Sequence, residues 1–316
     1  MSAPTVLGRQ WLRYGQLVVS KGSAGLDLSN LRLRFEVRAN DVETPNTAVV
    51  RVYNLASDTV NSIIAEYDTV TLTAGYVEGP QANIFQGDIK RFYFGKEKNV
   101  DSYLEICAGD GDLAYNRSVI NQTFPAGVTD QQTLSALASS MGLPVAQSAN
   151  GYLTLGGVLP RGKTLFGMAR IHMRDLANDN DCRWSIQNGV VTLVPNTGYL
   201  PGQAIEINSA TGMIGTPEQT DNGIIVRCLL NPLIKIGQAV KINNSDINQA
   251  SLRSNFGPGY RQQYYPATIS NDGLYRVLVA EHVGDTRATG ESWYTELVCL
   301  DIDPSSPAST SVLSNG

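Results

Sequence analysis

Apolar and polar side chains alternate strictly over residues 31–38. Leu33, Phe35 and Val37 are separated by single arginine or glutamate residues, and this period of two predicts a β-strand with one buried face. Similar patterns predict four more strands nearby, at residues 48–55, 68–76, 83–94 and 103–108. A short helix is expected from Ser57 to Glu66, with Ser57 as its cap. We expect this region to form a small antiparallel barrel or sandwich.

The hydrophobic period changes after Gly109. Thr129 is placed to cap a helix whose apolar side chains recur at helical spacing, namely Leu134, Leu137, Ala138 and Met141. Gly142 is expected to end this helix. A second helix is expected after Thr164, carrying Leu165, Met168, Ala169, His172 and Leu176. Residues 182–194 predict a hairpin around an Asn-Gly turn. The middle region therefore has the pattern of an α+β fold.

The third region returns to β patterns. Strands are expected at residues 224–230, 239–242, 273–282 and 292–300. A polar segment from Asn243 to Asp272 is longer than an ordinary loop. Its aromatic residues form a candidate partner-docking loop, consisting of Phe256, Tyr260, Tyr264 and Tyr265. A flexible excursion without a role is the alternative for this segment.

These patterns divide the chain into two β modules on either side of a small α+β region. The expected boundaries are 1–112 for the first β module, 113–200 for the α+β insert and 201–303 for the second β module, with a disordered tail at 304–316. The two modules share an order of signals. AVVRVYNL at 48–55 is similar to IIVRCLLN at 224–231, and DSYLEICAGDGD at 101–112 is similar to SWYTELVCLDID at 292–303.

Between these pairs, DTVTLTAGY is similar to GQAVKINN, and IFQGDIKRF is similar to GLYRVLVAE. The alternative explanation is chance similarity between β segments. If the repeat is real, three copies of the chain would supply six modules, and cyclic oligomers can close such head-to-tail contacts.

Composition and charge narrow the class of protein. The 316 residues carry a net charge of −5, which argues against a nucleic-acid binder. The four cysteines are far apart, so the sequence indicates neither a zinc site nor a disulfide framework. No signal peptide is evident at the N-terminus, and no apolar stretch is long enough for a membrane span. We expect a soluble protein made in the cytoplasm, with no cofactor and no metal-ligating site residues.

Enzymatic motifs are weak. The acidic residues are scattered, and the two histidines lie outside any nucleophile motif. GDGD at 109–112 lacks the other ligands of a calcium loop and the lysine of a P-loop, so a turn is expected there. Asp179 and Asp181 are better explained by a polar loop than by a cation site. We therefore expect no enzymatic activity.

An ordered series of segments carries a resemblance to a known family. VRVYNLASDT, VTLTAGY, IFQGDI, DGDLAYNRSVIN, WSIQNG, TGMIGTPEQTDNGIIVRCLLNP and DGLYRV, in this order, resemble the baseplate hub proteins of contractile-tailed bacteriophages. The resemblance spans roughly residues 30–300. It implies a mainly β fold with two tube-type antiparallel β-barrel modules flanking a small α+β region.

The resemblance also implies a function. The expected protein is a structural component of the virion, a homotrimeric ring that joins the sixfold tail tube to the central spike protein. Tape-measure and baseplate wedge proteins are further expected partners, and genome DNA would pass through without specific binding. We expect a channel poor in exposed lysine and arginine, because basic walls would bind phosphates. The alternatives are a sixfold tail-tube initiator or terminator, and a carbohydrate- or receptor-binding tail protein.

Overall fold

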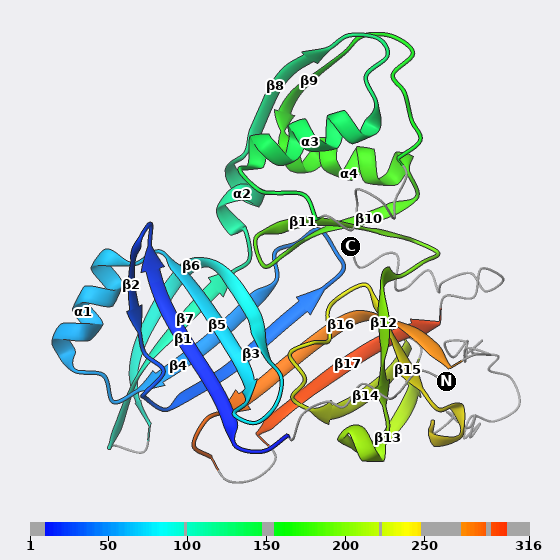
Figure 1. Ribbon diagram of the computed structural model, residues 1–316. Helices are drawn as coiled ribbons and strands as arrows, with labels where there is room; N and C mark the ends of the chain where they lie inside the picture. Colours follow the sequence, from blue (N-terminus) through cyan, green and yellow to red (C-terminus); the bar gives the residue numbers. More distant parts are fainter. Residues whose placement is uncertain are drawn as a thin grey trace, which may run out of the picture.

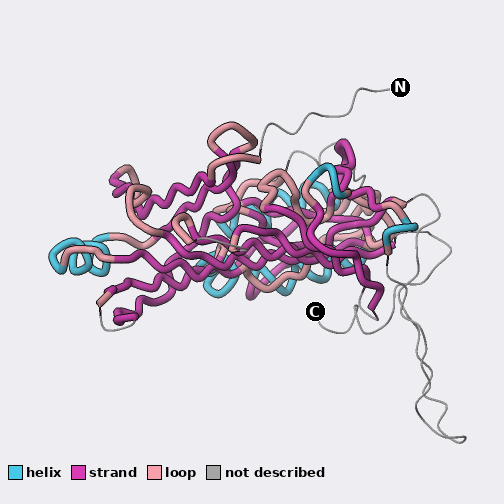
Figure 2. Tube along the Cα trace, turned by 90° about the horizontal axis from the view of Figure 1, so that it is seen from below, coloured by secondary structure: helices cyan, strands magenta, loops and turns pink. Residues whose placement is uncertain are grey.

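The computed structural model describes residues 10–97, 100–146, 155–220, 223–247, 273–288 and 292–301. The chain is mainly β, with few helices and with antiparallel pairing dominant (Figure 1). In the view from below, strands run along the long dimension of the molecule, and a helix projects at one end (Figure 2).

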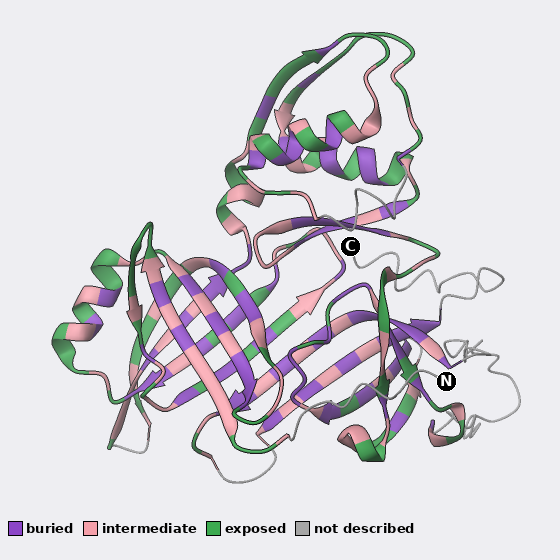
Figure 3. Cartoon of the chain, in the orientation of Figure 1, coloured by how far each residue is buried: buried purple, intermediate pink, exposed green. Residues whose placement is uncertain are grey.

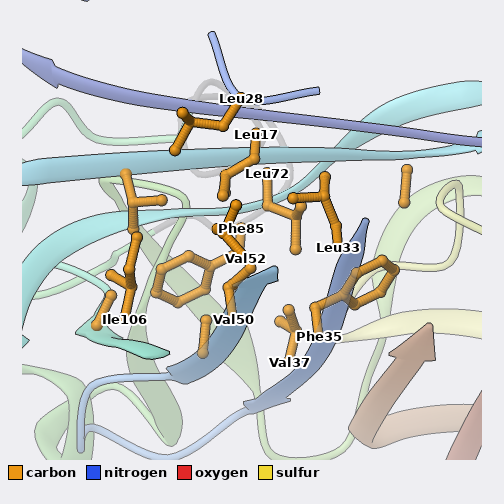
Figure 4. Close-up of a cluster of buried hydrophobic side chains, with 14 of the residues drawn as sticks. Leu17, Leu28, Leu33, Phe35, Val37, Val50, Val52, Leu72, Phe85 and Ile106 are labelled. Atoms are coloured by element: carbon orange, nitrogen blue, oxygen red, sulfur yellow. The ribbon is translucent and has the colours of Figure 1, made fainter. Parts of the chain in front are cut away.

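The N-terminal part contains seven strands and one helix. They are β1 Arg13–Lys21, β2 Ala24–Asp27, β3 Leu33–Asn40, β4 Thr47–Tyr53, α1 Ser57–Glu66, β5 Thr69–Tyr76, β6 Gln81–Glu97 and β7 Asp101–Gly109. Alternate side chains of these strands are fully buried in one cluster, which includes Leu17, Phe35, Val50 and Ile106 (Figure 4). Gly87 in β6 lies where an added Cβ would be 2.5 Å from the carbonyl oxygen of Gly109, so the two backbones approach each other closely at this glycine.

The middle of the chain forms a separate lobe, which we define as residues 112–195. Its elements are α2 Asp112–Arg117, β8 Val119–Phe124, α3 Asp130–Met141, β9 Lys163–Met168, α4 Ala169–Asp179, β10 Cys182–Gln187 and β11 Val190–Pro195. Thr129 caps α3 and Gly142 ends it in a left-handed conformation, as predicted. The predicted hairpin at the Asn-Gly turn is confirmed by β10 and β11.

One helix prediction in the lobe is wrong at its start. Leu165 and Met168 belong to strand β9, which pairs with β8, and α4 begins only at Ala169. Gly167 has a φ of 124°, which a helix cannot accommodate. Leu165 is buried from the strand rather than from a helix face.

The C-terminal part adds six strands. They are β12 Leu200–Ile207, β13 Met213–Thr220, β14 Gly223–Leu229, β15 Gln238–Ile242, β16 Leu274–Asp285 and β17 Trp293–Asp301, with short 3-10 turns at Ser209–Thr211 and Asn244–Asp246. Side chains along β14 and β17 alternate mostly between buried and partly exposed (Figure 3), as expected for strands with one face on a core. This core includes Ile224, Val226, Val277 and Leu297.

The two β parts share one 13-stranded sheet, with the order β13-β14-β17-β16-β3-β4-β7-β6-β5-β1-β2 and with β15 and β12 branching from β16. Strand β16 pairs antiparallel with β3 and so joins parts of the chain about 245 residues apart. We call this pairing the seam. The two expected barrels are not confirmed, since no sheet is closed among the described strands. Instead, the seam joins into one sheet what the sequence suggested were two separate units.

The sheet contains an internal repeat. The order β3-β4-β7-β6-β5 recurs as β13-β14-β17-β16-β15, and every pairing within both series is antiparallel. We call β3–β7 the first repeat and β13–β17 the second. The order of similar segments seen in the sequence is therefore a real structural repeat. Two of the sequence matches are displaced by one residue. When the strands are aligned by their pairing, β5 matches β15 and β6 matches β16 one residue away from the match read from the sequence.

Candidate functional site

The most extended feature is an outer face that runs across eight consecutive strands, β13-β14-β17-β16-β3-β4-β7-β6. The opposite face of these strands covers the two cores. Cross-strand register places charged side chains in rows on the outer face, where arginines stand among glutamates. These residues are Arg34, Arg38, Arg51, Arg91, Arg227, Glu36, Glu105, Glu218, Glu281 and Glu296.

The same arginine, glutamate and tyrosine group occurs once in each repeat. In the first repeat Arg51 Nε lies 2.6 Å from Glu105 Oε2, and the Arg51 guanidinium lies 4.9 Å from the Tyr103 ring centroid. In the second, Arg227 Nη2 lies 2.6 Å from Glu296 Oε2. Its guanidinium lies 4.5 Å from the Tyr294 ring centroid. Each arginine is thus held by an ion pair and by an aromatic face.

These pairs affect titration on the outer face. The hydrogen bond to Glu105 raises the pKa of Arg51, so this arginine stays charged. Burial raises the pKa of Glu281, and nearby Glu36 and Glu296 add to the rise, whereas Arg38 and Arg227 oppose it. Charges of both signs therefore act on one another across the seam.

The seam is fixed at one end by a buried carboxylate. Asp285 of β16 accepts hydrogen bonds from the Arg32 guanidinium, the shortest at 2.7 Å, and from the backbone N–H groups of Arg287 and Ala288. Burial alone would raise the pKa of Asp285, but the Arg32 and backbone hydrogen bonds outweigh it, so the pKa lies below its usual range. Asp285 is therefore ionised at neutral pH and ties β16 to the chain just before β3.

Close packing fixes the middle of the seam. Gly284 faces Phe35 of β3, and a Cβ at Gly284 would lie 2.2 Å from the Phe35 ring. Phe35 also packs edge-on against Trp293, with ring centroids 5.4 Å apart. His282 is buried beside Val37 and its Nδ1 lies 2.8 Å from Thr295 Oγ1. Burial lowers the pKa of His282 to about 4, so the imidazole is neutral at pH 7.

A buried ion cluster attaches the lobe to the seam. Asp41, just after β3, lies 3.1 Å from Arg183 of β10 and 3.3 Å from Arg276 of β16. Arg276 also donates to the carbonyl oxygens of Pro195 and Gly198, at 2.7 and 3.1 Å. One carboxylate thus holds the first repeat, the second repeat and the lobe together.

A second attachment involves the predicted Asn-Gly turn. Asp110, just after β7, accepts hydrogen bonds from the backbone N–H groups of Asn188 and Gly189. Asn46 donates to the Ile186 carbonyl oxygen at 3.0 Å. Burial raises the pKa of Asp110 to about 7, although these hydrogen bonds oppose the rise. The GDGD segment is therefore a structural connection, since Asp110 holds the β10–β11 turn.

A cavity of about 380 Å³ lies where the lobe meets the two repeats. Its lining includes Asp110, His282, Asn46, Gln187 and Lys235. Each of the first four is already engaged in the hydrogen bonds that hold the lobe or the seam. We therefore assign the cavity to the junction of the three units.

The eight-strand path has two different ends. Residues 89–97 of β6 pair with β7 on one side, and the pairing of β6 with β5 stops at Asp88. At the other end, β13 pairs with β14 and ends the strand order. Among the described strands, neither β13 nor the part of β6 beyond Ile89 has a neighbour on its outer side. Tyr93 and Phe94 lie next to each other on this part of β6, and they are 49% and 58% exposed.

The structure does not describe the site residues that the sequence predicted. Phe256, Tyr260, Tyr264 and Tyr265 lie outside the described residues, so their docking role stays a prediction. Among the residues the structure does describe, no group of three or more His, Cys, Asp and Glu could hold a metal ion. No helix in the described part is long and apolar enough to cross a membrane. The open strand ends were not predicted as a site, because they depend on the order of the strands in the sheet.

Solved structures with the same fold come from bacteriophage tails and a related secretion system. A 43 kDa tail protein of prophage MuSo2 from Shewanella oneidensis matches with a TM-score of 0.54 and 7% identity, covering 91% of this chain and 98% of that one. A tail protein from Neisseria meningitidis matches with a TM-score of 0.54 and 8% identity, covering 92% and 97%.

An Escherichia coli type VI secretion component, described as similar to the T4 tail proteins gp27 and gp5, matches with a TM-score of 0.51 and 10% identity, over 90% and 76% of the two chains. At these identities the likeness concerns the fold, which is that of a phage tail protein. No curated protein sequence matches the chain.

The family model for the baseplate hub gp41 matches residues 18–256. Because this match covers most of the chain, the protein belongs to the baseplate hub gp41 family, as the ordered sequence segments indicated. The family is a structural component of the phage tail, and membership implies a place in the virion baseplate.

Proposed function

We propose that three copies of this chain form a ring that joins the tail tube to the central spike and surrounds the DNA channel. The observation that carries this proposal is the internal repeat of five strands, joined edge to edge through the seam. Two repeats in each of three chains give six similar modules, which suit a sixfold tube on one side. The trimer itself suits a threefold spike on the other side.

In this proposal each repeat acts as a tube-type module, and the eight-strand outer face lines the channel. Its arginines stand beside glutamates, as Arg51 beside Glu105 and Arg227 beside Glu296. The channel would therefore reach neutrality by pairing charges, and not by lacking arginine as the sequence suggested. Paired arginines hold DNA phosphates less strongly, because their charge is already compensated. DNA would then pass without specific binding.

The lobe would lie at one end of this ring, since Asp41, Asn46 and Asp110 attach it where β3 and β7 end and β4 begins. That end is available to a tube, spike, tape-measure or wedge protein. The sixfold tube initiator remains the alternative, but two repeats in one chain favour three copies.

The copy number per particle tests the proposal. Quantitative mass spectrometry on purified tails, referenced to the tube protein, is expected to give three hub chains per tail. Six chains per tail would contradict the trimeric ring and support the tube initiator. Absence from the particle would contradict both.

A further inference from the structure

The seam is a pairing between the two repeats, and it joins one particular pair of edges. Residues 279–285 of β16 pair antiparallel with residues 34–40 of β3. In the repeat, β6 is the counterpart of β16, and β13 is the counterpart of β3. These counterparts are the strands at the two open ends of the eight-strand path.

The repeats align residue by residue around this edge. Each of β6 and β16 has one extra residue at the same place, between Ile89 and Arg91 in one and between Val277 and Val279 in the other. The ion pairs Arg51–Glu105 and Arg227–Glu296 occupy equivalent positions. Counting from these markers, Phe94 corresponds to His282, Gly95 to Val283 and Glu97 to Asp285. On the other edge, Glu218 corresponds to Glu36 and Ile214 to Arg34.

The exposed fractions of equivalent side chains on β16 and β6 show that the edge of β6 lacks a covering strand. His282 is 4% exposed because β3 lies beside it, whereas its counterpart Phe94 is 58% exposed. A large aromatic side chain at a strand edge gains most from a neighbour that covers it. Phe94 is therefore an exposed aromatic side chain on an edge that a neighbouring strand would cover.

The direction of the strands selects the neighbour. All seven pairings along the eight-strand path are antiparallel, so β6 and β13 run in opposite directions. A second copy placed head to tail therefore continues the antiparallel alternation without a break. A register shift in β13 falls between Ile214 and Glu218, so Pro217, which has no N–H group, lies within the irregular stretch.

We propose that β6 of one copy pairs antiparallel with β13 of a second copy, in the register of the seam. Gly95 then lies opposite Glu218, and Glu97 lies opposite Ile214. The chain-to-chain contact repeats the pairing that the chain already makes with itself. This proposal rests on the proposed ring, and it adds the surface and the register by which the ring closes.

A double variant, Glu97→Cys with Ile214→Cys, tests the register. Within one chain the two positions lie on the first and last strands of the eight-strand path, about 30 Å apart at ordinary strand spacing. A disulfide requires Cα atoms within about 7 Å, so a bond between them joins different copies. In tails carrying this variant, oxidation is expected to produce covalent dimers and trimers that reducing agent dissolves. Mass spectrometry should identify the linked 97–214 peptide pair.

The single variants are the matched controls. Neither should produce a 97–214 link, and a 97–97 link in Glu97→Cys alone would show that the edge pairs with itself and would overturn the proposal. Three copies per tail without any 97–214 link would also overturn it, while leaving the trimeric ring standing. Six copies per tail would instead contradict the ring.

A second variant tests the apolar edge without cysteines. Phe94→Lys should fold normally, because Phe94 is 58% exposed in the single chain. It should reduce hub incorporation into tails at least tenfold, since a charge replaces the covered aromatic group. Val77→Lys is the control, because Val77 is 55% exposed but belongs to neither edge strand. Equal incorporation of the two variants would overturn the role of the β6 edge.

Discussion

The first and second repeats are alike where they form the outer face and different behind it. Both place an arginine, a glutamate and a tyrosine at equivalent positions. Both also interrupt the long strand at the same point. Behind this face, β1 joins β5 antiparallel, whereas β12 joins β15 parallel. The shared features thus belong to the face that we propose lines the channel, and each repeat completes its core in its own way.

The largest difference concerns one edge. In the second repeat, β16 is covered by β3 of the same chain. In the first repeat, the equivalent part of β6 has no described neighbour beyond β7. Equivalent substitutions on β16 and β6 should therefore change the free energy of unfolding of the isolated chain by unequal amounts, and this difference can be measured.

The strongest test of the inequality is Gly284→Val. The added side chain would meet the Phe35 ring, so overpacking should lower the free energy of unfolding by about 3 kcal/mol. Lys96→Val is the matched control at the equivalent position of β6, and its effect should stay within about 0.5 kcal/mol. Urea denaturation of both variants gives the comparison. Equal losses would mean that the seam is not the tighter edge.

A second test removes the charge at the end of the seam. Asp285→Asn should cost about 2 kcal/mol at pH 7, because it removes charge-assisted hydrogen bonds from Arg32 and the backbone. The pKa of Asp285 is lowered in the folded chain, so its contribution is present above about pH 4. The difference between variant and wild type should therefore shrink as the pH falls below about 4. A difference that stays constant to pH 3 would contradict this account.

A third test uses the buried histidine of the seam. His282 has a pKa of about 4 when folded and about 6.5 when unfolded. The unfolded chain therefore binds its proton first, and stability falls as the pH drops below about 6.5. Relative to wild type, His282→Gln should gain about 1.4 kcal/mol between pH 7.5 and pH 5.5. Asp110 titrates in both proteins and cancels in this difference. No relative gain would mean that His282 is solvated.

The smallest expected effect compares the two ion pairs of the outer face. Glu105→Gln and Glu296→Gln should each cost about 0.5 kcal/mol in low salt. The Glu105 side chain is 16% exposed and that of Glu296 is 34% exposed, so the loss should be larger in the first repeat. Thermal unfolding at two salt concentrations measures this. A larger loss in the second repeat would mean that exposure does not rank the two pairs.

Local patterns in the sequence predicted much of the fold. The alternation at Leu33, Phe35 and Val37 fixes which face of β3 is buried, and Thr129 with Gly142 marks both ends of α3. The repeat was visible because two runs share a Val-Arg pair at equivalent places. These signals all act within a few residues, where hydrophobic period and capping chemistry are direct.

The seam and the lobe attachments could not be predicted in this way. Asp285 and Arg32 are about 250 residues apart, and nothing near either residue specifies the other. The same holds for Asp41 with Arg276. Strands β1, β12 and β13 were missed because their patterns mix glycine, proline and polar residues, which weaken the period-two signal. The open edges depend on the order of the strands in the sheet, and the hydrophobic period of a single strand does not specify that order.

The seam also has a consequence for how the chain is made. Strand β3 leaves the ribosome early, but its partner β16 begins at residue 274. At ordinary rates of synthesis, β3 waits for many seconds with an unpaired edge. During that interval the growing chain displays the same kind of edge that two finished copies use in the proposed ring. Slow translation or crowded polysomes should therefore favour premature joining between nascent chains, a hazard that ends once the last strands have emerged.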